Sequence, residues 1–261
     1  MSNNKSLPIC GIRVDLVQIC DVINMMDAWI INRSVGNYIV LSNSNGAVLS
    51  MNDLILKDAI AKSSLSVPDG ASLILAARLY GQRLEKRVYG PDLLIEFLKS
   101  THDKNYKHFF YGATEGTINR LTERLKQKFP YLKVSGTYAP PFRMLTKEED
   151  SKVVELINNS GTDVLWVGLG CPKQEIWMCE HKDVLKIPVM VGIGAAFDFL
   201  SGMKPQAPLF MRENGLEWFF RLSTEPGRLW KRYLVNNSLF VYFTLKQFLL
   251  HNLNQTKREN V

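Results

Sequence analysis

The sequence of 261 residues is poor in cysteine: it has four, and none of them forms a C-x-x-C pair. Their spacing argues against a zinc site, and four thiols in a chain of this length argue against a disulfide framework. No uncharged apolar run is long enough to span a bilayer, which takes about 18 residues or more. Residues 1–8 are short and polar and do not resemble a signal peptide. We therefore expect a cytoplasmic protein.

Motifs for nucleotides and metals are missing as well. The chain has no G-x-x-x-x-G-K-[ST] sequence, so a P-loop NTPase is not expected. It has no Asp-x-Asp, the usual carboxylate pair that holds Mg²⁺ or Mn²⁺ on a sugar nucleotide. The histidines are scattered and are predicted to be surface residues rather than ligands: His102, His108, His181 and His251. The sequence thus predicts no metal and no cofactor.

Charge is distributed unevenly along the chain. The net charge is +7, and residues 204–261, with nine Lys and Arg against four Asp and Glu, contribute +5 of it. A basic tail on a nearly neutral body favours an anionic partner, such as phosphate groups or a membrane surface. No nucleic-acid recognition motif accompanies the charge, so nucleic acid is not the predicted partner.

Up to residue 210, short apolar segments alternate with segments of helical periodicity. Strands are predicted at 38–41, 64–67, 108–111, 132–135, 164–168 and 189–192, and a strand or hairpin at 9–17. Helices are predicted at 21–31, 48–61, 71–80, 92–101, 115–129, 146–158 and from Pro172 to about 182. This alternation predicts an α/β fold with a Rossmann-like, mainly parallel sheet and helices on both faces.

After residue 210 the strand signals stop. Residues 213–222 and 225–252 have the pattern of two helices, so we predict an α/β core over 1–210 and a basic, amphipathic helical appendage over 211–261. Basic residues beside aromatic ones are typical of a helix that lies in the headgroup region of a membrane. A helix that packs on the core explains the same pattern, and both interpretations stay open.

Two kinds of turn are candidates for an active site. Asp69 stands between Pro68 and Gly70 at a predicted strand end, where a lone carboxylate suits a general base. An Asp before Gly also commonly bonds its own backbone in a turn. The turns Gly168-Leu-Gly170 and Gly192-Ile-Gly194 lack the third glycine of a dinucleotide fingerprint, although helix starts of this kind can hold a phosphate.

Polar residues follow the first glycine turn, at the start of a predicted helix. Lys173, Gln174 and Glu175 are expected at the carboxyl edge of the sheet, where doubly wound proteins bind ligands. Solvated residues after a tight turn explain the pattern equally well. The appendage adds Arg221, Arg228, Lys231 and Arg232, which form either a clamp for a diphosphate or a solvated face.

Five motifs follow one another along the chain: Pro68-Asp-Gly70, Arg87-Val-Tyr-Gly-Pro-Asp92, Gly168-Leu-Gly-Cys-Pro-Lys-Gln-Glu175, Gly192-Ile-Gly-Ala-Ala-Phe-Asp-Phe199, and Gly215-Leu-Glu-Trp-Phe-Phe-Arg221 with Glu225-Pro226. In this order they resemble the WecG/TagA/CpsF glycosyltransferases. The resemblance implies inverting, metal-independent transfer from a UDP-sugar to a polyprenyl-diphosphate-linked sugar at the inner face of the plasma membrane. Such steps build bacterial surface polysaccharides and exopolysaccharides. A homo-oligomer is left open.

The resemblance also implies roles for single residues. Asp69 matches the family's proposed general base, which would take the proton from the acceptor hydroxyl, and Gln174 matches a residue near the substrates. Arg221 and Arg228 match appendage arginines thought to reach the donor diphosphate, and Lys231 or Arg232 matches a third basic position. The family often has a Thr after its second strand. Here Ser42 or Asn43 holds that place.

The predicted substrate-binding residues are Ser42, Asn43, Asn45, Gly168, Gly170, Lys173, Gln174, Glu175, Gly192, Gly194, Arg221, Arg228, Lys231 and Arg232. Two other classes of protein remain as alternatives. A nucleotide-binding α/β oxidoreductase would bind NAD rather than UDP, and a non-enzymatic module that binds a membrane or nucleic acid would not need Asp69.

Overall fold

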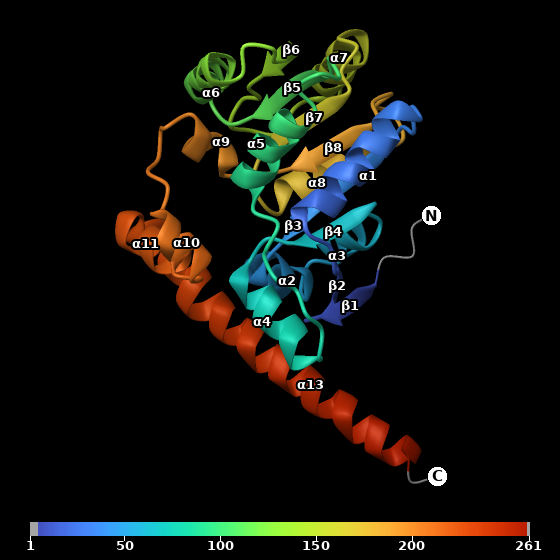
Figure 1. Cartoon of the computed structure of the whole chain (residues 1–261), viewed down its shortest axis with the longest axis vertical. Coiled ribbons are helices and arrows are strands. Elements are labelled where there is room, and N and C mark those ends of the chain that lie inside the picture. Colours follow the sequence, from blue (N-terminus) through green and yellow to red (C-terminus); the bar gives the residue numbers. More distant parts are fainter. Residues whose placement is uncertain (1–4, 260–261) are drawn as a thin grey trace.

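The computed structural model describes residues 5–259, with side chains for residues 5–250 and Leu253. In this part of the chain a six-stranded sheet forms the centre, in the order β4-β3-β8-β7-β5-β6, with every neighbouring pair parallel (Figure 1). The strands are β3 (Asn37–Ser42), β4 (Leu65–Pro68), β5 (Lys107–Gly112), β6 (Lys133–Tyr138), β7 (Val164–Gly168) and β8 (Val189–Gly192). The α/β prediction is confirmed.

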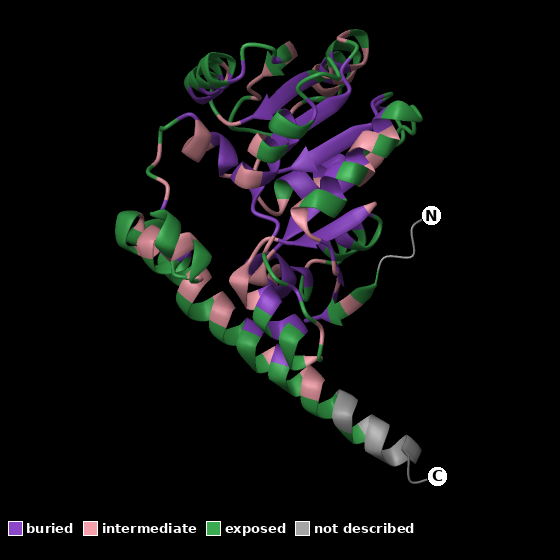
Figure 2. Ribbon diagram, viewed as in Figure 1, coloured by how far each residue is buried: buried purple, intermediate pink, exposed green. Residues whose placement is uncertain are grey.

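Helices cover both faces of the sheet. They are α1 (Ile19–Ile31), α2 (Ser44–Ser50), α3 (Leu54–Ala61), α4 (Ala71–Leu79), α5 (Gly90–Ser100), α6 (Glu115–Lys128), α7 (Lys147–Asn159), α8 (Lys173–His181) and α9 (Ala196–Leu200). Side chains alternate along each strand, so Tyr38 and Val40 pack with α2, α3, α4, α7 and α8, whereas Ile39 and Leu41 pack with α1, α5, α6 and α9. The result is a three-layer core, buried along the sheet (Figure 2).

The single helix predicted at 48–61 is wrong, because two helices occupy this region. Asn43 caps the first, its Oδ1 accepting from Gly46 N at 3.1 Å, and Asp53 caps the second, its Oδ1 accepting from Leu56 N at 3.0 Å. A side-chain cap replaces a missing helical hydrogen bond, so each cap sets a helix start. The polar run at 42–46 therefore begins a helix as well as ending a strand.

The hairpin at the start of the chain is confirmed. β1 (Ser6–Ile9) and β2 (Ile12–Asp15) pair antiparallel as a sheet of their own, and the turn between them places Cys10 and Gly11 at positive φ. Asp15 Oδ2 accepts a hydrogen bond of 2.7 Å from Ser66 N, which ties the hairpin to β4.

The appendage contains more helices than the two predicted. They are α10 (Leu209–Glu213), α11 (Glu217–Thr224), α12 (Pro226–Trp230), the π-helical turn η1 (Lys231–Asn236) and α13 (Asn237–Glu259). Gly215, at φ +72°, separates α10 from α11, so the single helix predicted at 213–222 is wrong. Residues 260–261 lie outside the described residues. The boundary between core and appendage at 210 stays a prediction.

The appendage packs on the core along one side, where Figure 1 shows α13 in red. Phe240 is buried in the core cluster, and the Gln247 side chain donates to Pro8 O at 2.6 Å and accepts from Cys10 N at 2.9 Å. The opposite side of the appendage exposes large apolar residues, among them Leu209, Phe210, Trp218, Phe219, Leu234, Val241, Leu245 and Leu249 (Figure 2). Within residues 5–259, no helix combines the length and the hydrophobicity that crossing a bilayer requires.

The prediction that the histidines lie on the surface is wrong for two of them. His108 is buried, accepts a hydrogen bond of 3.1 Å from Trp166 Nε1, and has its pKa lowered to about 3 by burial. His181 is buried beneath Trp177 and bonds Asp150 Oδ2 at 2.9 Å. Apolar neighbours on β7 and α8 bury these rings. The side chain of His251 lies outside the described residues.

Candidate active site

The carboxyl ends of four neighbouring strands bring the predicted site segments to one edge of the sheet. β3 and β4 end side by side, and Asp69 N donates to Ser42 O at 2.8 Å. β7 and β8 end next to them at Gly168 and Gly192, with the two glycine turns following. Parallel strands place all their carboxyl ends at the same edge, so residues far apart in sequence meet here.

Asp69 is the most unusual charged group at this edge. Its Oδ1 is buried and has no hydrogen-bond partner among the described residues. Burial raises the pKa of this carboxyl to about 6, against the lowering influence of Arg87, Arg221 and Arg232. A carboxyl with this pKa is half ionised just below neutral pH, which suits a proton acceptor.

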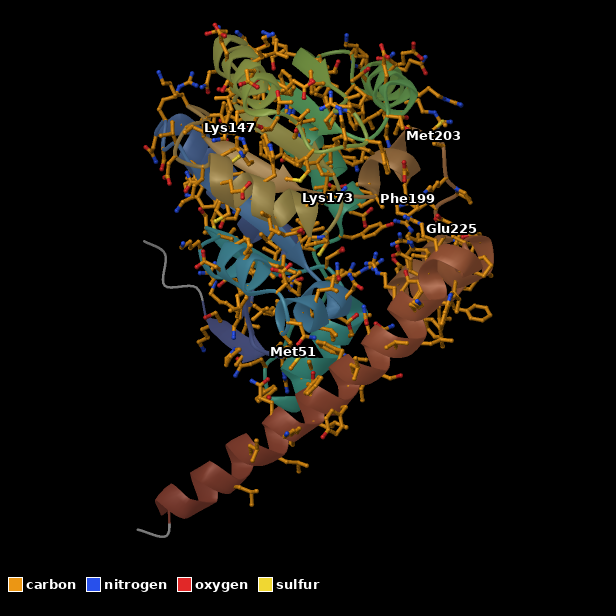
Figure 3. All side chains as sticks on the ribbon, turned by 180° about the vertical axis from the view of Figure 1, so that it is seen from behind. Met51, Lys147, Lys173, Phe199, Met203 and Glu225 are labelled. Atoms are coloured by element: carbon orange, nitrogen blue, oxygen red, sulfur yellow. The ribbon has the colours of Figure 1, made fainter. Side chains whose placement is uncertain are left out.

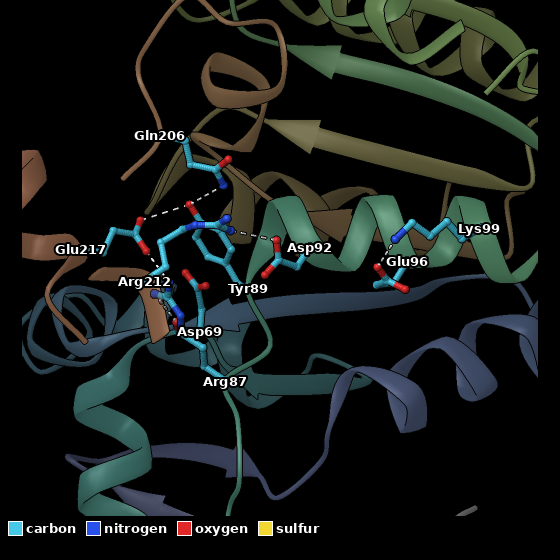
Figure 4. A network of polar contacts seen from close by, with 9 residues as sticks. All are labelled: Asp69, Arg87, Tyr89, Asp92, Glu96, Lys99, Gln206, Arg212 and Glu217. Atoms are coloured by element: carbon cyan, nitrogen blue, oxygen red, sulfur yellow. Dashed lines mark hydrogen bonds and ion pairs between the residues drawn. The ribbon is translucent and has the colours of Figure 1, made fainter. Parts of the chain in front are cut away.

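Arg87 lies beside Asp69 and belongs to a buried network (Figure 4). Its Nη1 donates to the backbone oxygen of Asp69 at 3.4 Å, its guanidinium stands 4.3 Å from the ring centre of Tyr89, and its Nη2 pairs with Glu217 Oε2. The Tyr89 hydroxyl donates to Glu217 Oε1 at 3.2 Å and accepts from Gln206 Nε2 at 3.3 Å. This network joins the loop between α4 and α5, and through Arg87 the backbone of Asp69, to the first residue of α11.

Two appendage arginines reach the same region. Arg221 is half-buried, its guanidinium stands 5.3 Å from the ring centre of Phe199, and its Nε is buried with no hydrogen-bond partner within residues 5–259. Arg232 is half-buried and favours the ionised forms of both Asp69 and Glu175. Figure 3 shows Phe199 of α9 close to the start of the appendage. The appendage therefore supplies positive charge to the carboxyl edge.

The other two predicted appendage cations lie outside this group. Arg228 is exposed, and its Nε pairs with Glu225 Oε2 at 2.7 Å. Lys231 is exposed, with its Nζ 5.5 Å from the ring centre of Trp230. A π-helical turn inserts an extra residue and changes which side chains face inward. Here η1 turns Arg232 rather than Lys231 toward the two carboxyls.

Gln174 and Glu175 are both buried, with exposed fractions of 4% and 2%. Gln174 Oε1 accepts from Gly170 N at 3.2 Å, and its Nε2 donates to Glu175 Oε1 at 2.9 Å, so Gln174 itself uses the Gly170 N–H. A Cβ on Gly192 would lie 3.1 Å from Gln174 Nε2, and one on Gly194 would lie 3.3 Å from Gln174 Oε1. Both glycines thus make room for Gln174.

Glu175 has an oxygen without a partner as well. Its Oε2 is buried and finds no partner of ordinary hydrogen-bond geometry in the described part of the chain. Burial raises the pKa of this carboxyl, while hydrogen bonds from Gln174, its own backbone N–H and the Cys171 thiol, together with the charge of Arg232, act to lower it. Two buried carboxyls lie at this edge under the influence of one arginine, each with an oxygen that lacks a partner of ordinary hydrogen-bond geometry among the described residues, and this arrangement favours a ligand site here.

The remaining predicted residues have local structural contacts. Ser42 Oγ is buried and shares a hydrogen bond of 2.8 Å with Ser66 Oγ, and Asn43 caps α2. Asn45 is buried, and its Oδ1 accepts from Asn236 Nδ2 of η1 at 2.8 Å. A Cβ on Gly168 would lie 2.6 Å from the Phe197 ring. Lys173 is exposed, and its Nζ lies 5.8 Å from the centre of the Phe142 ring. Substrate binding by these residues stays a prediction.

Sequence reasoning missed Arg87, Tyr89 and Glu217 as site residues. The motifs that contain them were visible, but nothing in a motif shows that an arginine and a glutamate 130 residues apart form a buried pair. Arg232 was among the predicted residues, but spacing alone does not distinguish it from Lys231.

A cavity of about 320 Å³ lies at the opposite, amino-terminal edge of the sheet. Its lining includes Arg33, Lys104 and Asp163, and its charges pair locally: Arg33 with Asp163 at 2.8 Å, and Lys104 with Asp27 at 2.6 Å. It lies far from Asp69, and its satisfied charges give no sign of a ligand. In the part of the chain that the structure describes, no three His, Cys, Asp or Glu side chains gather to hold a metal ion.

Comparison with known proteins adds independent findings. The model of the glycosyl transferase WecG/TagA/CpsF family matches residues 7–254. Among curated proteins, the chain is similar to three enzymes named N-acetylglucosaminyldiphosphoundecaprenol N-acetyl-beta-D-mannosaminyltransferase. The one from Bacillus spizizenii is 29% identical over 83% of this chain and 82% of its own length. The one from Bacillus subtilis is 29% identical over 81% of this chain and 80% of its own length. The one from Staphylococcus aureus NCTC 8325 is 28% identical over 88% of each chain.

Proposed function

Because the chain belongs to the WecG/TagA/CpsF family of glycosyltransferases, we propose that it transfers a sugar from a UDP-sugar to an acceptor linked to polyprenyl diphosphate. The relatives' names specify an undecaprenyl-diphosphate-linked N-acetylglucosamine acceptor and an N-acetylmannosaminyl group as the sugar transferred. These two are therefore the first candidates for this enzyme. The alternative of a nucleotide-binding oxidoreductase finds no support, since the family and the relatives are glycosyltransferases.

The observation that carries the proposal is the buried Oδ1 of Asp69, which has no hydrogen-bond partner within residues 5–259 and lies under the influence of Arg87, Arg221 and Arg232. Asp69 accepts the proton of the acceptor hydroxyl as that oxygen attacks the anomeric carbon of the donor. The new bond forms opposite the departing UDP, so the anomeric configuration inverts. The positive charges of the arginines favour the ionised carboxylate of Asp69, so that it can accept a proton near neutral pH.

The leaving diphosphate gains negative charge as the sugar departs. Arg221, with an unused Nε, and Arg232 are placed to stabilise that charge at a site partly shielded from water. Arginine does this well because its planar N–H groups match phosphate oxygens in pairs. We propose that these side chains provide the charge that a divalent metal provides in other transferases, so the reaction proceeds without one.

The experiment that tests this function is a transfer assay with the purified full chain. A panel of UDP-sugars, UDP-N-acetylmannosamine among them, is incubated with undecaprenyl-diphosphate N-acetylglucosamine in the presence of EDTA. We expect one donor to give a lipid-linked disaccharide with inverted anomeric configuration, and that donor to raise the melting temperature because it binds the native state. No product with any donor, together with stabilisation by NAD, would contradict the proposal.

We also propose that the apolar outer side of the appendage rests on the membrane that carries the acceptor. Replacing Leu245 and Leu249 with serine is expected to abolish co-sedimentation with anionic vesicles, because both side chains are exposed on the outer side of α13. The control replaces Leu54 and Ile55 on α3, which are more exposed than Leu245 and Leu249, with serine and should leave sedimentation unchanged. Equal loss in both variants would show that α13 is not the membrane contact.

A further inference from the structure

Glu217 is a buried acid that the transfer reaction described above does not use. It is the first residue of α11, and only 7% of its surface is exposed. Both carboxylate oxygens are taken by the core: Oε2 by Arg87 Nη2 and Oε1 by the Tyr89 hydroxyl at 3.2 Å. Figure 4 shows these groups around Asp69. An acid from the appendage thus binds the arginine that stands beside the proposed base.

A second ion pair joins the same two parts of the chain with the charges reversed. Arg212 of α10 donates to Asp92 Oδ1 of α5 at 3.2 Å (Figure 4). The two pairs therefore both hold the appendage to residues 87–92. They differ in one respect: Arg87 and Glu217 act directly on the ionisation of Asp69, whereas Arg212 and Asp92 are not among the groups that influence it most.

The pair of half-buried Arg87 and buried Glu217 is a poor way to hold α11 on the core, because desolvation of both charges offsets much of their attraction. Apolar side chains of similar size would hold α11 on the core at least as well. The position of this pair beside Asp69 suggests that its value lies in what it does to the neighbouring carboxyl.

We propose that Glu217 is a positioning residue: it holds Arg87 beside Asp69 and offsets its charge, so that the docking of α11 produces a competent general base. This inference rests on the proposed function, in which Asp69 is the base. It adds that the appendage controls the base through Glu217, separately from any contact that its arginines make with a substrate.

The charges around Asp69 decide the direction of the effect. Arg87 from the loop between α4 and α5, Arg221 from α11 and Arg232 from η1 favour the carboxylate, whereas Glu217 from α11 opposes it, as burial does. With Glu217 neutralised, Arg87 acts without a counter-charge. The base then loses its proton at lower pH and is a weaker proton acceptor.

The test compares Glu217→Gln with the wild type and with Asp92→Asn, which breaks the other pair between core and appendage. In the protein without substrates, the Asp69 carboxyl carbon is titrated by ¹³C NMR and identified by its absence in Asp69→Asn. We expect the midpoint in Glu217→Gln to fall by roughly half to one pH unit, the effect of removing one nearby charge. Asp92→Asn should keep the wild-type midpoint. An unchanged or raised midpoint in Glu217→Gln overturns the inference.

A charge swap covers the case in which Glu217→Gln does not fold. Arg87→Glu combined with Glu217→Arg keeps a pair between core and appendage but places the negative charge nearer to Asp69. We expect a folded protein whose Asp69 midpoint lies above that of the wild type. A wild-type midpoint and full activity in the swapped protein would show that the pair serves docking alone.

Activity separates this inference from the proposed function. The acid limb of kcat/KM should follow the NMR midpoint in each variant, moving to lower pH in Glu217→Gln. If Asp69→Asn retains full transfer, the base assignment itself fails. If Asp69→Asn is inactive while the acid limb of Glu217→Gln stays in place, the base assignment stands and only the role of Glu217 is wrong.

Discussion

Replacing Asp69 with asparagine is expected to lower kcat for sugar transfer by about 10²–10⁴-fold, the usual contribution of a general base. Asparagine has nearly the same shape but cannot accept the proton of the acceptor hydroxyl. The KM for the donor should change little, because the arginines remain in place. The measurement is steady-state transfer at saturating donor, with Asp58→Asn, a surface acid on α3, as the control. Full activity of Asp69→Asn would remove Asp69 from the mechanism.

The same substitution should leave the protein at least as stable as the wild type. Burial raises the pKa of Asp69 to about 6 in the folded chain, above the ordinary value of about 3.9 for an exposed aspartate, so the folded state binds this proton more tightly. Stability contributed by this group is therefore present at low pH and is lost as the pH rises toward 6. Asparagine does not ionise, so the variant avoids this loss of stability at neutral pH. Urea unfolding at pH 7 measures it, and a marked destabilisation would indicate a structural role for Asp69.

Replacing Arg232 with methionine is expected to lower kcat/KM by about 10²-fold, the effect of losing one donor to a developing negative charge. Methionine keeps much of the apolar stem, so η1 should stay docked through Asn236, and α13 through Phe240 and Gln247. The adjacent Lys231→Met is the matched control. Lys231 is exposed, and loss of an exposed charge should change kcat/KM by no more than about twofold.

Inhibition by free UDP, which carries the diphosphate but no sugar, tests whether Arg232 contacts the donor diphosphate. If Arg232 contacts the diphosphate, inhibition by UDP should weaken in Arg232→Met and remain unchanged in Lys231→Met. The reverse ranking would mean that η1 presents Lys231 inward when substrates are bound. Equal, small effects in both variants would mean that Arg221 and the core provide the necessary charge.

Local patterns were sufficient for the architecture. The strand at 164–168, the helix at 146–158 and the alternation of strands with helices all depend on residues close in sequence, and the structure confirms each of them. Local turn chemistry also predicts that Asp69 lies just beyond the end of a strand, and β4 does end at Pro68. Motif order was enough to identify the family, since the family model covers the same region.

Long-range contacts account for what local patterns missed. Arg87 and Glu217 are 130 residues apart, and only the packing of α11 on the loop between α4 and α5 makes them partners. The hydroxyl of Ser42 is engaged by Ser66 because β3 and β4 pair, and the π-helical turn selects Arg232 over Lys231. Helix periodicity and turn preferences are properties of a few neighbouring residues. The ionisation of a buried carboxyl depends on every charge that the fold brings near it, so the environment that makes Asp69 a candidate base exists only in the folded chain.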